Sequence, residues 1–290
     1  MRERVQRKAP AKINLTLKVA GKRTDGYHEL ETVMQQIDLY DEITIIAADE
    51  GIVVSSNNSE VPVDASNLAF KAALLIGDRL GLNNGFRIYI DKKIPIGAGL
   101  AGGSTNAAAV LLGINEMLGG ELDLDTLLDL GLQVGSDVPF CILGGTALAR
   151  GRGEILEPLP PGPHLEMVLV KPAQQIATAE VYRDLKLYEL HDQPNNRAFL
   201  EAWHKYDIIG LAAQMKNDLE TVSITKCPEI GVIKARLVSL GALHTLMSGS
   251  GPSVIGIFGD RQGAEKAWQT IKEEYQESFL SSSYSKIKVV

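Results

Sequence analysis

Cysteine is scarce in this chain of 290 residues, which contains only Cys141 and Cys227. Two cysteines cannot form the disulfide framework of a small secreted protein, so we expect a reducing compartment, the cytoplasm. No apolar run approaches the roughly 18–20 residues that span a bilayer, which argues against a membrane protein. The charged segment 1–10 has no apolar stretch behind it and does not resemble a secretory signal.

Positive charge is also in deficit, because 29 Lys and Arg face 36 Asp and Glu, a net charge of −7. This balance argues against non-specific nucleic-acid binding, which needs a basic surface. A hydrophobic content of 45% and a charged content of 22% exclude a disordered or fibrous chain. The length suggests one large or two modest domains, and no internal repeat is visible.

Hydrophobic periodicity predicts strands and helices in the first half of the chain. Ile13, Leu15 and Leu17 alternate with polar residues, which is typical of a strand with one buried face. Further strands are expected at residues 42–48, 52–55 and 86–90, and helices at residues 68–80 and 106–118.

A proline-rich stretch at residues 151–163 marks a change of organisation and predicts two domains, residues 1–157 and residues 158–290. Extra helices aside, the second region reads as the split β-α-β-β-α-β pattern of a ferredoxin-like domain. Its strands are expected at residues 165–170, 243–247, 253–258 and 286–290, and its helices at residues 179–188, 197–219, 228–240 and 263–276.

A glycine-rich loop precedes the helix expected at residues 106–118, and it matches G-x-G-x-x-G over residues 97–102. A Rossmann loop would need a hydrophobic strand directly before it, but Pro95 stands there. A P-loop would need a lysine before the hydroxyls of Ser104 and Thr105, and none is present. A flexible turn is the plain alternative. Four glycines and two hydroxyls at one helix start favour a phosphate cradle of backbone N–H groups.

The two hydroxyls of this loop have two interpretations. Ser104 and Thr105 are candidate ligands of phosphate or magnesium, or they are plain helix caps. A second glycine cluster at residues 248–253 is either a hairpin turn or a close backbone approach to a ligand.

Three segments, taken in order and spacing, resemble the GHMP kinase superfamily: residues 10–15, 95–105 and 248–253. Because they span nearly the whole chain, the combination is far more specific than any single loop. Residues 22–30 and 135–140 resemble those family members that use ATP to phosphorylate the 2-hydroxyl of a cytidine diphosphate methylerythritol, in the non-mevalonate route to isopentenyl diphosphate.

The resemblance implies an α+β fold of two domains with the active-site cleft between them. The N-terminal domain would be ribosomal-protein-S5-like and would bind ATP, and the C-terminal domain would be ferredoxin-like. The pattern read from residues 158–290 agrees with the second of these.

By the resemblance, Asp137 is the base that takes the proton of the substrate hydroxyl, and Lys12 orients it and stabilises negative charge. From the residues alone, Asp137 could equally cap a turn before Pro139, and Lys12 could be a solvated lysine on the polar face of its strand. Asn14 lies on the same face as Lys12 and would hydrogen-bond the substrate alcohol.

The resemblance places ATP on the glycine-rich loop and at three positions near the adenine. The expected ATP ligands are Pro95, Ile96, Gly97, Ala98, Gly99, Leu100, Ala101, Gly102, Gly103, Ser104 and Thr105, together with Asn67, Leu68 and Lys92. Asn67 as a simple helix cap is the competing interpretation. The sequence offers no metal-ligand cluster, so Mg2+ is expected to arrive with ATP.

The cytidine end of the substrate needs flat surfaces. By the resemblance, Tyr27 and Tyr182 stack on the two faces of the cytosine, His28 reads its polar edge, and Thr178 lies in the same substrate-binding segment as Tyr182. Aromatic–base stacking contributes roughly 1–3 kcal/mol per base, enough to distinguish a nucleotide from a bare alcohol. Tyr182 could instead be a core residue of an amphipathic helix.

Three other functions stay open: a family kinase acting on mevalonate or homoserine, a nucleotide sensor without catalysis, and a Rossmann dehydrogenase. We expect small-molecule partners, no nucleic acid, no membrane, and a monomer or weak homodimer.

Overall fold

The computed structural model describes residues 2–82 and 84–284, and contacts divide the chain into two compact units. The first unit comprises Met1–Ala11, Leu39–Ile96 and Ala101–Gly144, and the second comprises Lys12–Asp38, Gly97–Leu100 and Gly145–Val290. This grouping differs from the consecutive domains 1–157 and 158–290, because the first two strands each run through both units. Compactness does not test the consecutive division, which stays a prediction.

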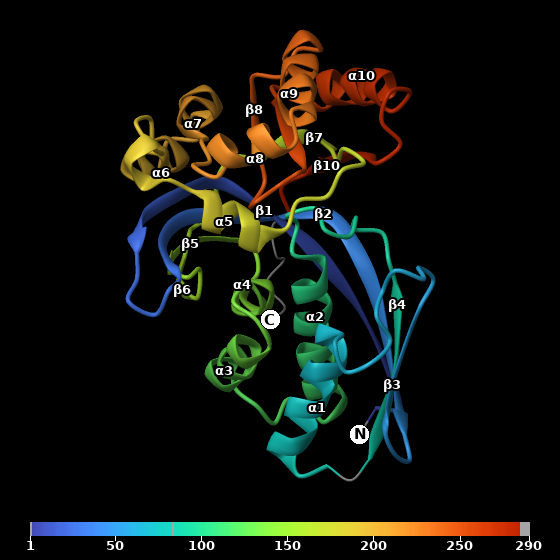
Figure 1. Ribbon diagram of the computed structural model, residues 1–290. Helices are drawn as coiled ribbons and strands as arrows, with labels where there is room; N and C mark the ends of the chain where they lie inside the picture. Colours follow the sequence, from blue (N-terminus) through green and yellow to red (C-terminus); the bar gives the residue numbers. More distant parts are fainter. Residues whose placement is uncertain (1, 83, 285–290) are drawn as a thin grey trace. The chain divides into compact units, whose positions relative to one another are not determined.

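The elements are labelled in Figure 1. The strands are β1 (Arg4–Lys22), β2 (His28–Ala48), β3 (Ile52–Ser56), β4 (Gly85–Asp91), β5 (Thr146–Gly151), β6 (Ile155–Pro158), β7 (Glu166–Val170), β8 (His244–Met247), β9 (Val254–Phe258) and β10 (Ser278–Ser282). The helices are α1 (Leu68–Leu80), α2 (Gly102–Met117), α3 (Leu124–Val134), α4 (Val138–Leu143), α5 (Thr178–Asp184), α6 (Asn196–His204), α7 (Ile208–Gln214), α8 (Glu220–Lys226), α9 (Glu229–Ser239) and α10 (Arg261–Ile271). In the described part of the chain, no helix combines the length and hydrophobicity that crossing a bilayer requires.

In the first unit, β4 pairs with the end of β2 on one side and with β3 on the other, antiparallel and parallel respectively. Helix α1 starts where the Asn67 side chain accepts the N–H of Ala69, and it ends at Gly81, whose φ of 62° is the left-handed conformation that glycine adopts without strain. The alanine-rich helix α2 packs against α1, and both α3 and α4 pack against α2.

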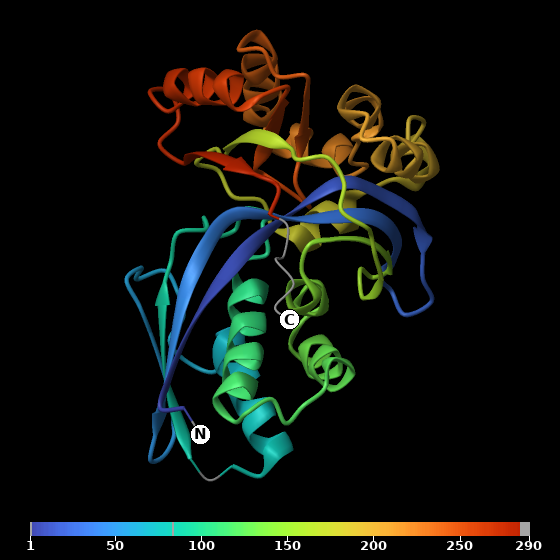
Figure 2. The ribbon, with the colours of Figure 1, turned by 180° about the vertical axis from the view of Figure 1, so that it is seen from behind.

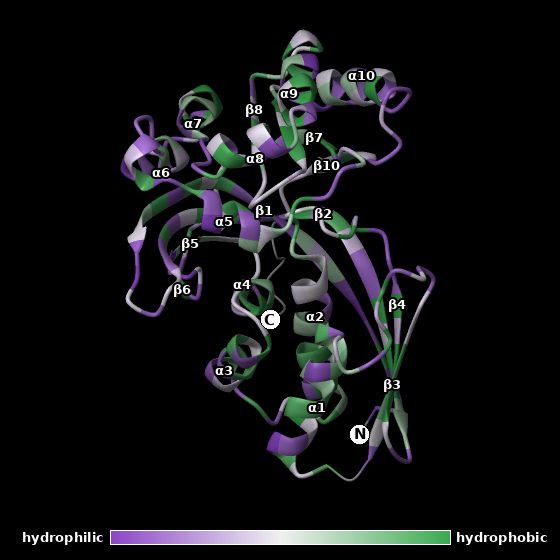
Figure 3. Ribbon diagram, viewed as in Figure 1, coloured by the Kyte–Doolittle hydropathy of each residue, from purple (hydrophilic) through white to green (hydrophobic). Residues whose placement is uncertain are grey.

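In the second unit, the start of β2 pairs with β5, and β5 pairs with β6. Strands β1 and β2 pair with each other and lie side by side as two long strands in Figures 1 and 2. A separate antiparallel sheet has the strand order β10-β7-β9-β8. Its strand β7 consists mainly of hydrophobic residues (Figure 3), and α9 and α10 pack on this sheet.

That sheet confirms the ferredoxin-like pattern, since its four strands and its helices follow the order β-α-β-β-α-β. The strand expected at residues 286–290 lies outside the described residues, and β10 completes the sheet. The single helix expected at residues 197–219 is wrong. The chain leaves α6 at Tyr206, where φ is 57°, and Asp207 then caps α7.

One-sided burial of the strand at residues 13–17 is also wrong, because both faces of this part of β1 are buried. Lys12 donates to Asn14 Oδ1 at 2.9 Å, and Asn14 Nδ2 donates to Thr32 Oγ1 at 2.8 Å. Thr32 in turn donates to the carbonyl of Thr16. The alternating pattern therefore separates an apolar buried face from a polar buried face whose groups hydrogen-bond one another.

Candidate functional site

The glycine-rich loop passes from the first unit into the second at Gly97 and returns at Ala101. Gly97 and Gly99 have φ of 65° and 73°, and Ala101, the residue before α2, has φ of 56°. A left-handed alanine is strained, and such strain is concentrated at functional sites. The loop thus has a fixed shape that ends at a helix N-terminus, the arrangement that binds anions through backbone N–H groups.

Ser104 and Thr105 lie inside the first turn of α2, so the helix-cap interpretation of them is wrong. Thr105 is buried and donates its hydroxyl to the carbonyl of Pro10 at 2.7 Å. That contact ties α2 to the first half of β1 within the first unit. Ser104 is half-buried and is therefore the more accessible hydroxyl of the two.

Lys92 lies beside the same helix start and is buried against Asp41. Its Nζ lies 2.6 Å from Asp41 Oδ2, which also accepts the side-chain amide of Asn106 at 2.7 Å. Asp41 Oδ1 accepts the backbone N–H groups of residues 93 and 94. A Cβ added to Gly102 would lie 2.8 Å from the Lys92 amine, so the amine sits directly against the first residue of α2.

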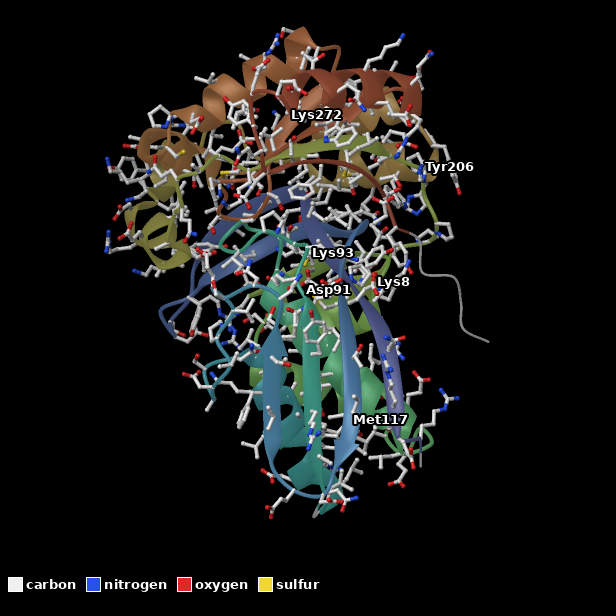
Figure 4. The ribbon with its side chains drawn as sticks, turned by 90° about the vertical axis from the view of Figure 1, so that its right-hand side faces the viewer. Lys8, Asp91, Lys93, Met117, Tyr206 and Lys272 are labelled. Carbon is white, nitrogen blue, oxygen red and sulfur yellow. The ribbon has the colours of Figure 1, made fainter. Side chains whose placement is uncertain are left out.

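Burial lowers the pKa of Lys92, and the charge of Asp41 opposes that shift. The next lysine points the other way. Lys93 lies beside Asp91 on the exposed surface in Figure 4, and its Nζ is 5.6 Å from the centroid of the Tyr40 ring. Of the two lysines, Lys92 is the one that lies against the start of α2.

Asn67 and Leu68 begin α1. The capping interpretation of Asn67 is confirmed, because its Oδ1 accepts the N–H of Ala69 and its Nδ2 donates to Pro62. Leu68 Cδ1 lies 3.6 Å from the position a Cβ would take on Gly103. The start of α1 thus adjoins the start of α2, and a contact of these residues with adenine stays a prediction.

Asp137 stands at the N-terminal end of α4 and is half-buried. Its carboxylate makes no hydrogen bond that caps α4. Helix α4 packs against α2, the helix that follows the glycine-rich loop. Asp137 therefore stands at the end of a helix that contacts α2. Its role as base stays a prediction.

In the second unit, the tip of the glycine loop lies against the second glycine cluster. Ser248 Oγ donates to the carbonyl of Gly99 at 3.1 Å, and a Cβ on Gly99 would come within 2.3 Å of the Ser248 carbonyl oxygen. The N–H of Lys12 donates to the carbonyl of Leu100 at 3.1 Å. Lys12 and both glycine segments therefore meet in one place.

The second glycine cluster is a hairpin turn between β8 and β9, as one interpretation predicted. Side chains from other segments also hydrogen-bond to it. Asn217 Nδ2 donates to the carbonyls of Met247 and Gly249, each at 2.8 Å. The Thr178 hydroxyl lies 2.8 Å from that of Ser250. Thr178 thereby contacts the second glycine cluster, while Asn217 is a supporting residue that the sequence analysis did not identify.

The aromatic residues expected at the cytosine also lie in the second unit. The His28 ring stacks on Tyr182, with centroids 5.2 Å apart and planes inclined by 29°. Tyr182 is half-buried against the hydrophobic core of this unit, as the core interpretation predicts, and its stacking on cytosine stays a prediction. Tyr27 is 57% exposed, and its ring faces the guanidinium of Arg152.

The last features of the site are the protonation of His28 and the arrangement of side chains that could bind a metal ion. Burial, with a smaller effect from Lys22, lowers the pKa of His28, which favours its neutral imidazole. Within residues 2–82 and 84–284, no group of three or more His, Cys, Asp or Glu side chains is arranged to hold a metal ion.

Comparison with known proteins identifies the family. The model for the GHMP kinases N terminal domain matches residues 67–145, and the model for the GHMP kinases C terminal domain matches residues 199–277. The chain belongs to the GHMP kinase family. The resemblance seen in the three sequence segments and the two-domain α+β fold are thus confirmed.

Relatives of this GHMP kinase carry a more specific name. A protein of Syntrophomonas wolfei named 4-diphosphocytidyl-2-C-methyl-D-erythritol kinase is 55% identical over 98% of this chain and 100% of its own length. One of the same name from Alkaliphilus metalliredigens is 46% identical over 99% of each chain.

Solved structures agree. A crystal structure of 4-(cytidine 5'-diphospho)-2C-methyl-D-erythritol kinase superposes with a TM-score of 0.84 at 33% identity, covering 97% of this chain and 100% of that one. A homoserine kinase from Cytophaga hutchinsonii has a TM-score of 0.78 at 21% identity, covering 98% and 96%, and shares the fold.

Proposed function

We propose that this GHMP kinase transfers the γ-phosphoryl group of ATP to the 2-hydroxyl of 4-diphosphocytidyl-2-C-methyl-D-erythritol. The products are the 2-phosphate and ADP, in the non-mevalonate route to isopentenyl diphosphate. The observation that carries the proposal is the 55% identity, over nearly the full length of both chains, to a relative of that name. The homoserine kinase from Cytophaga hutchinsonii, at 21% identity, and the L. major mevalonate kinase, at 17%, support the fold alone.

In this proposal, the ATP phosphates bind the backbone N–H groups of residues 97–105 at the start of α2. Phosphoryl transfer requires positioning and neutralisation of charge more than covalent chemistry. The ammonium of Lys12 neutralises charge on the transferred group, and Asn14, which accepts a hydrogen bond from Lys12, also holds the substrate alcohol. Asp137 accepts the proton that the 2-hydroxyl loses as it attacks.

Magnesium accompanies ATP, bound chiefly by phosphate oxygens and water, and neutralises phosphate charge when present. At the start of α2, the half-buried Ser104 would be the more accessible hydroxyl ligand for it, because Thr105 is buried. In this proposal, the adenine of ATP lies next to Asn67, Leu68 and Lys92.

The cytosine is proposed to stack on the aromatic residues of the second unit. His28 and Tyr182 already form one stacked pair there, and the neutral imidazole of His28 can both donate and accept a hydrogen bond. Tyr27 offers a largely exposed ring. We further propose that the enzyme acts in the cytoplasm as a monomer or weak homodimer, without nucleic-acid or membrane partners.

The deciding experiment incubates the purified chain with ATP, Mg2+ and the cytidine diphosphate alcohol, and measures ADP release together with the 31P NMR signal of a new phosphomonoester. Mevalonate and homoserine are assayed in parallel. Turnover confined to the cytidine substrate supports the proposal. Turnover of another alcohol, or ATP binding without transfer to any of the three, contradicts it.

A further inference from the structure

Arg152 is a residue that the proposed mechanism does not use, yet it lies against a proposed substrate-binding residue. It sits in the turn between β5 and β6, and its guanidinium carbon is 5.0 Å from the centroid of the Tyr27 ring. We propose that Arg152 is a positioning residue, which holds the Tyr27 ring from one face so that the other face can stack on the cytosine of the substrate. This inference rests on the proposed function, because it concerns the same substrate.

The backbone of Tyr27 is fixed by its own turn. Its N–H donates to Asp25 Oδ1 at 3.1 Å, and its carbonyl accepts the N–H of Arg23 at 2.8 Å. Arg23 Nε in turn donates to the Asp25 carboxylate at 3.1 Å. The main chain of Tyr27 is therefore held, while the exposed ring needs a partner outside its own turn to select one orientation.

Arg152 is itself held in place. Its N–H donates to Glu154 Oε2 at 2.5 Å, and its Nε lies 3.5 Å from Glu154 Oε1. A Cβ on Gly151 would lie 2.8 Å from Glu154 Oε2, so a glycine at this position lets the carboxylate fold back over the turn. These contacts hold the Arg152 side chain in place, and only 32% of that side chain is exposed.

One carboxylate joins the two turns. Glu29 Oε1 accepts the N–H of Gly151 at 3.1 Å, and Glu29 Oε2 accepts Arg23 Nη1 at 2.7 Å. Glu29 therefore holds the turn that contains Arg152 next to the turn that contains Tyr27. This arrangement of the two turns places the guanidinium of Arg152 against the ring of Tyr27.

The benefit to binding is preorganisation. A freely rotating ring must lose its rotational freedom when a base stacks on it, and a ring already held loses less. A cation over an exposed tyrosine contributes about 0.5–1 kcal/mol, which corresponds to a change of about 2- to 5-fold in affinity. Arg152 should thus act on substrate affinity and not on the chemical step.

The test is steady-state kinetics on Arg152→Met, which keeps an unbranched, largely aliphatic side chain and removes the guanidinium. We expect the KM for the cytidine substrate to rise about 2- to 5-fold, with kcat and the KM for ATP unchanged. Arg152→Lys should recover part of the loss. The matched control is Arg150→Met, since Arg150 on the same hairpin pairs with Glu157 and should leave all three parameters unchanged.

A double-mutant cycle separates this role from direct binding of the substrate by Arg152. In a Tyr27→Leu background, Arg152→Met should produce no further rise in KM, because the ring through which it acts is gone. An equal rise in both backgrounds, an unchanged KM in the single variant, or a loss confined to kcat would each overturn the inference. Absence of turnover in the wild-type chain would instead overturn the proposed function itself.

Discussion

Lys92 and Asp41 form an ion pair 2.6 Å long in which the carboxylate is fully buried and only 6% of the lysine side chain is exposed. Asp41 also accepts hydrogen bonds from Asn106 in α2 and from the backbone directly after β4. The pair therefore joins the end of β4 to the first turns of the helix that receives the glycine loop. Within the first unit, it fixes the helix start that is proposed to bind the ATP phosphates.

Asp41→Asn should destabilise the protein by about 3–5 kcal/mol, the usual result of leaving one partner of a buried pair without its counter-charge. The pKa of Lys92, already lowered by burial, should fall further once the opposing charge of Asp41 is gone. Urea unfolding measures the loss, and the KM for ATP should rise in parallel. Glu42→Gln is the control, because Glu42 pairs with the exposed Lys93 and such pairs contribute about 1 kcal/mol or less. Equal stability losses in the two variants would contradict the role of the Asp41 pair.

Local signals in the sequence predicted what depends on neighbouring residues. Asn67 before an apolar helical stripe predicted a helix cap, and the strand and helix order of the second half predicted its ferredoxin-like sheet. Asp41 could not be predicted, because its partner Lys92 is 51 residues away and a lone aspartate in a strand carries no signal of a buried pair.

Burial of polar groups was equally invisible from sequence. Alternation along β1 placed Lys12 and Asn14 on one polar face and left a solvated Lys12 as one interpretation, but both residues are buried, and Asn14 hydrogen-bonds to Lys12 and Thr32. Asn217 supports the second glycine cluster from a distant helix-rich segment, which again only the fold brings into contact. Hydrophobic periodicity predicts which face of a strand is apolar, but it does not predict whether the polar face is exposed to solvent.

Gly99→Ala should cost more than the left-handed backbone alone. Its φ is 73°, and the new Cβ would lie 2.3 Å from the Ser248 carbonyl oxygen, so the two glycine segments must separate. Gly81→Ala is the matched control, since its φ is 62° and nothing lies within 4 Å of its Cβ position. The control should lose about 1–2 kcal/mol from backbone strain. Gly99→Ala should lose more and should also raise the KM for ATP. Equal losses with unchanged KM would show that the contact with Ser248 is unimportant.

Asp137→Asn should lower kcat by about two to four decades, the range that a general base contributes, while the KM for ATP stays within a few-fold. The amide keeps the size of the side chain but cannot take the proton of the hydroxyl. Asp129→Asn is the control, because Asp129 is an exposed residue of α3, and it should retain wild-type kcat. Turnover of Asp137→Asn within a few-fold of wild type would rule out this residue as the base.

His28 should make the KM for the cytidine substrate dependent on pH. Burial lowers the pKa of His28 below its ordinary value of 6.5, and Lys22 acts in the same direction. The neutral ring stacked on Tyr182 is therefore the favoured form, and acidification through the lowered pKa adds a charge that this position disfavours. The sign for stability is the same. The unfolded chain takes up the proton first, so the contribution of His28 falls as the pH drops from 6.5 toward the lowered pKa.

We expect the KM for the cytidine substrate to rise as the pH falls through that pKa, with the KM for ATP flat over the same range. Steady-state kinetics between about pH 5 and 7.5 spans the ordinary range of histidine titration. His28→Asn is the control, because asparagine keeps polar contacts and does not titrate. Its KM should be raised at pH 7 but should lack the acid limb. An acid limb that persists in His28→Asn would assign the pH dependence to another group, and an unchanged KM at pH 7 would remove His28 from cytosine recognition.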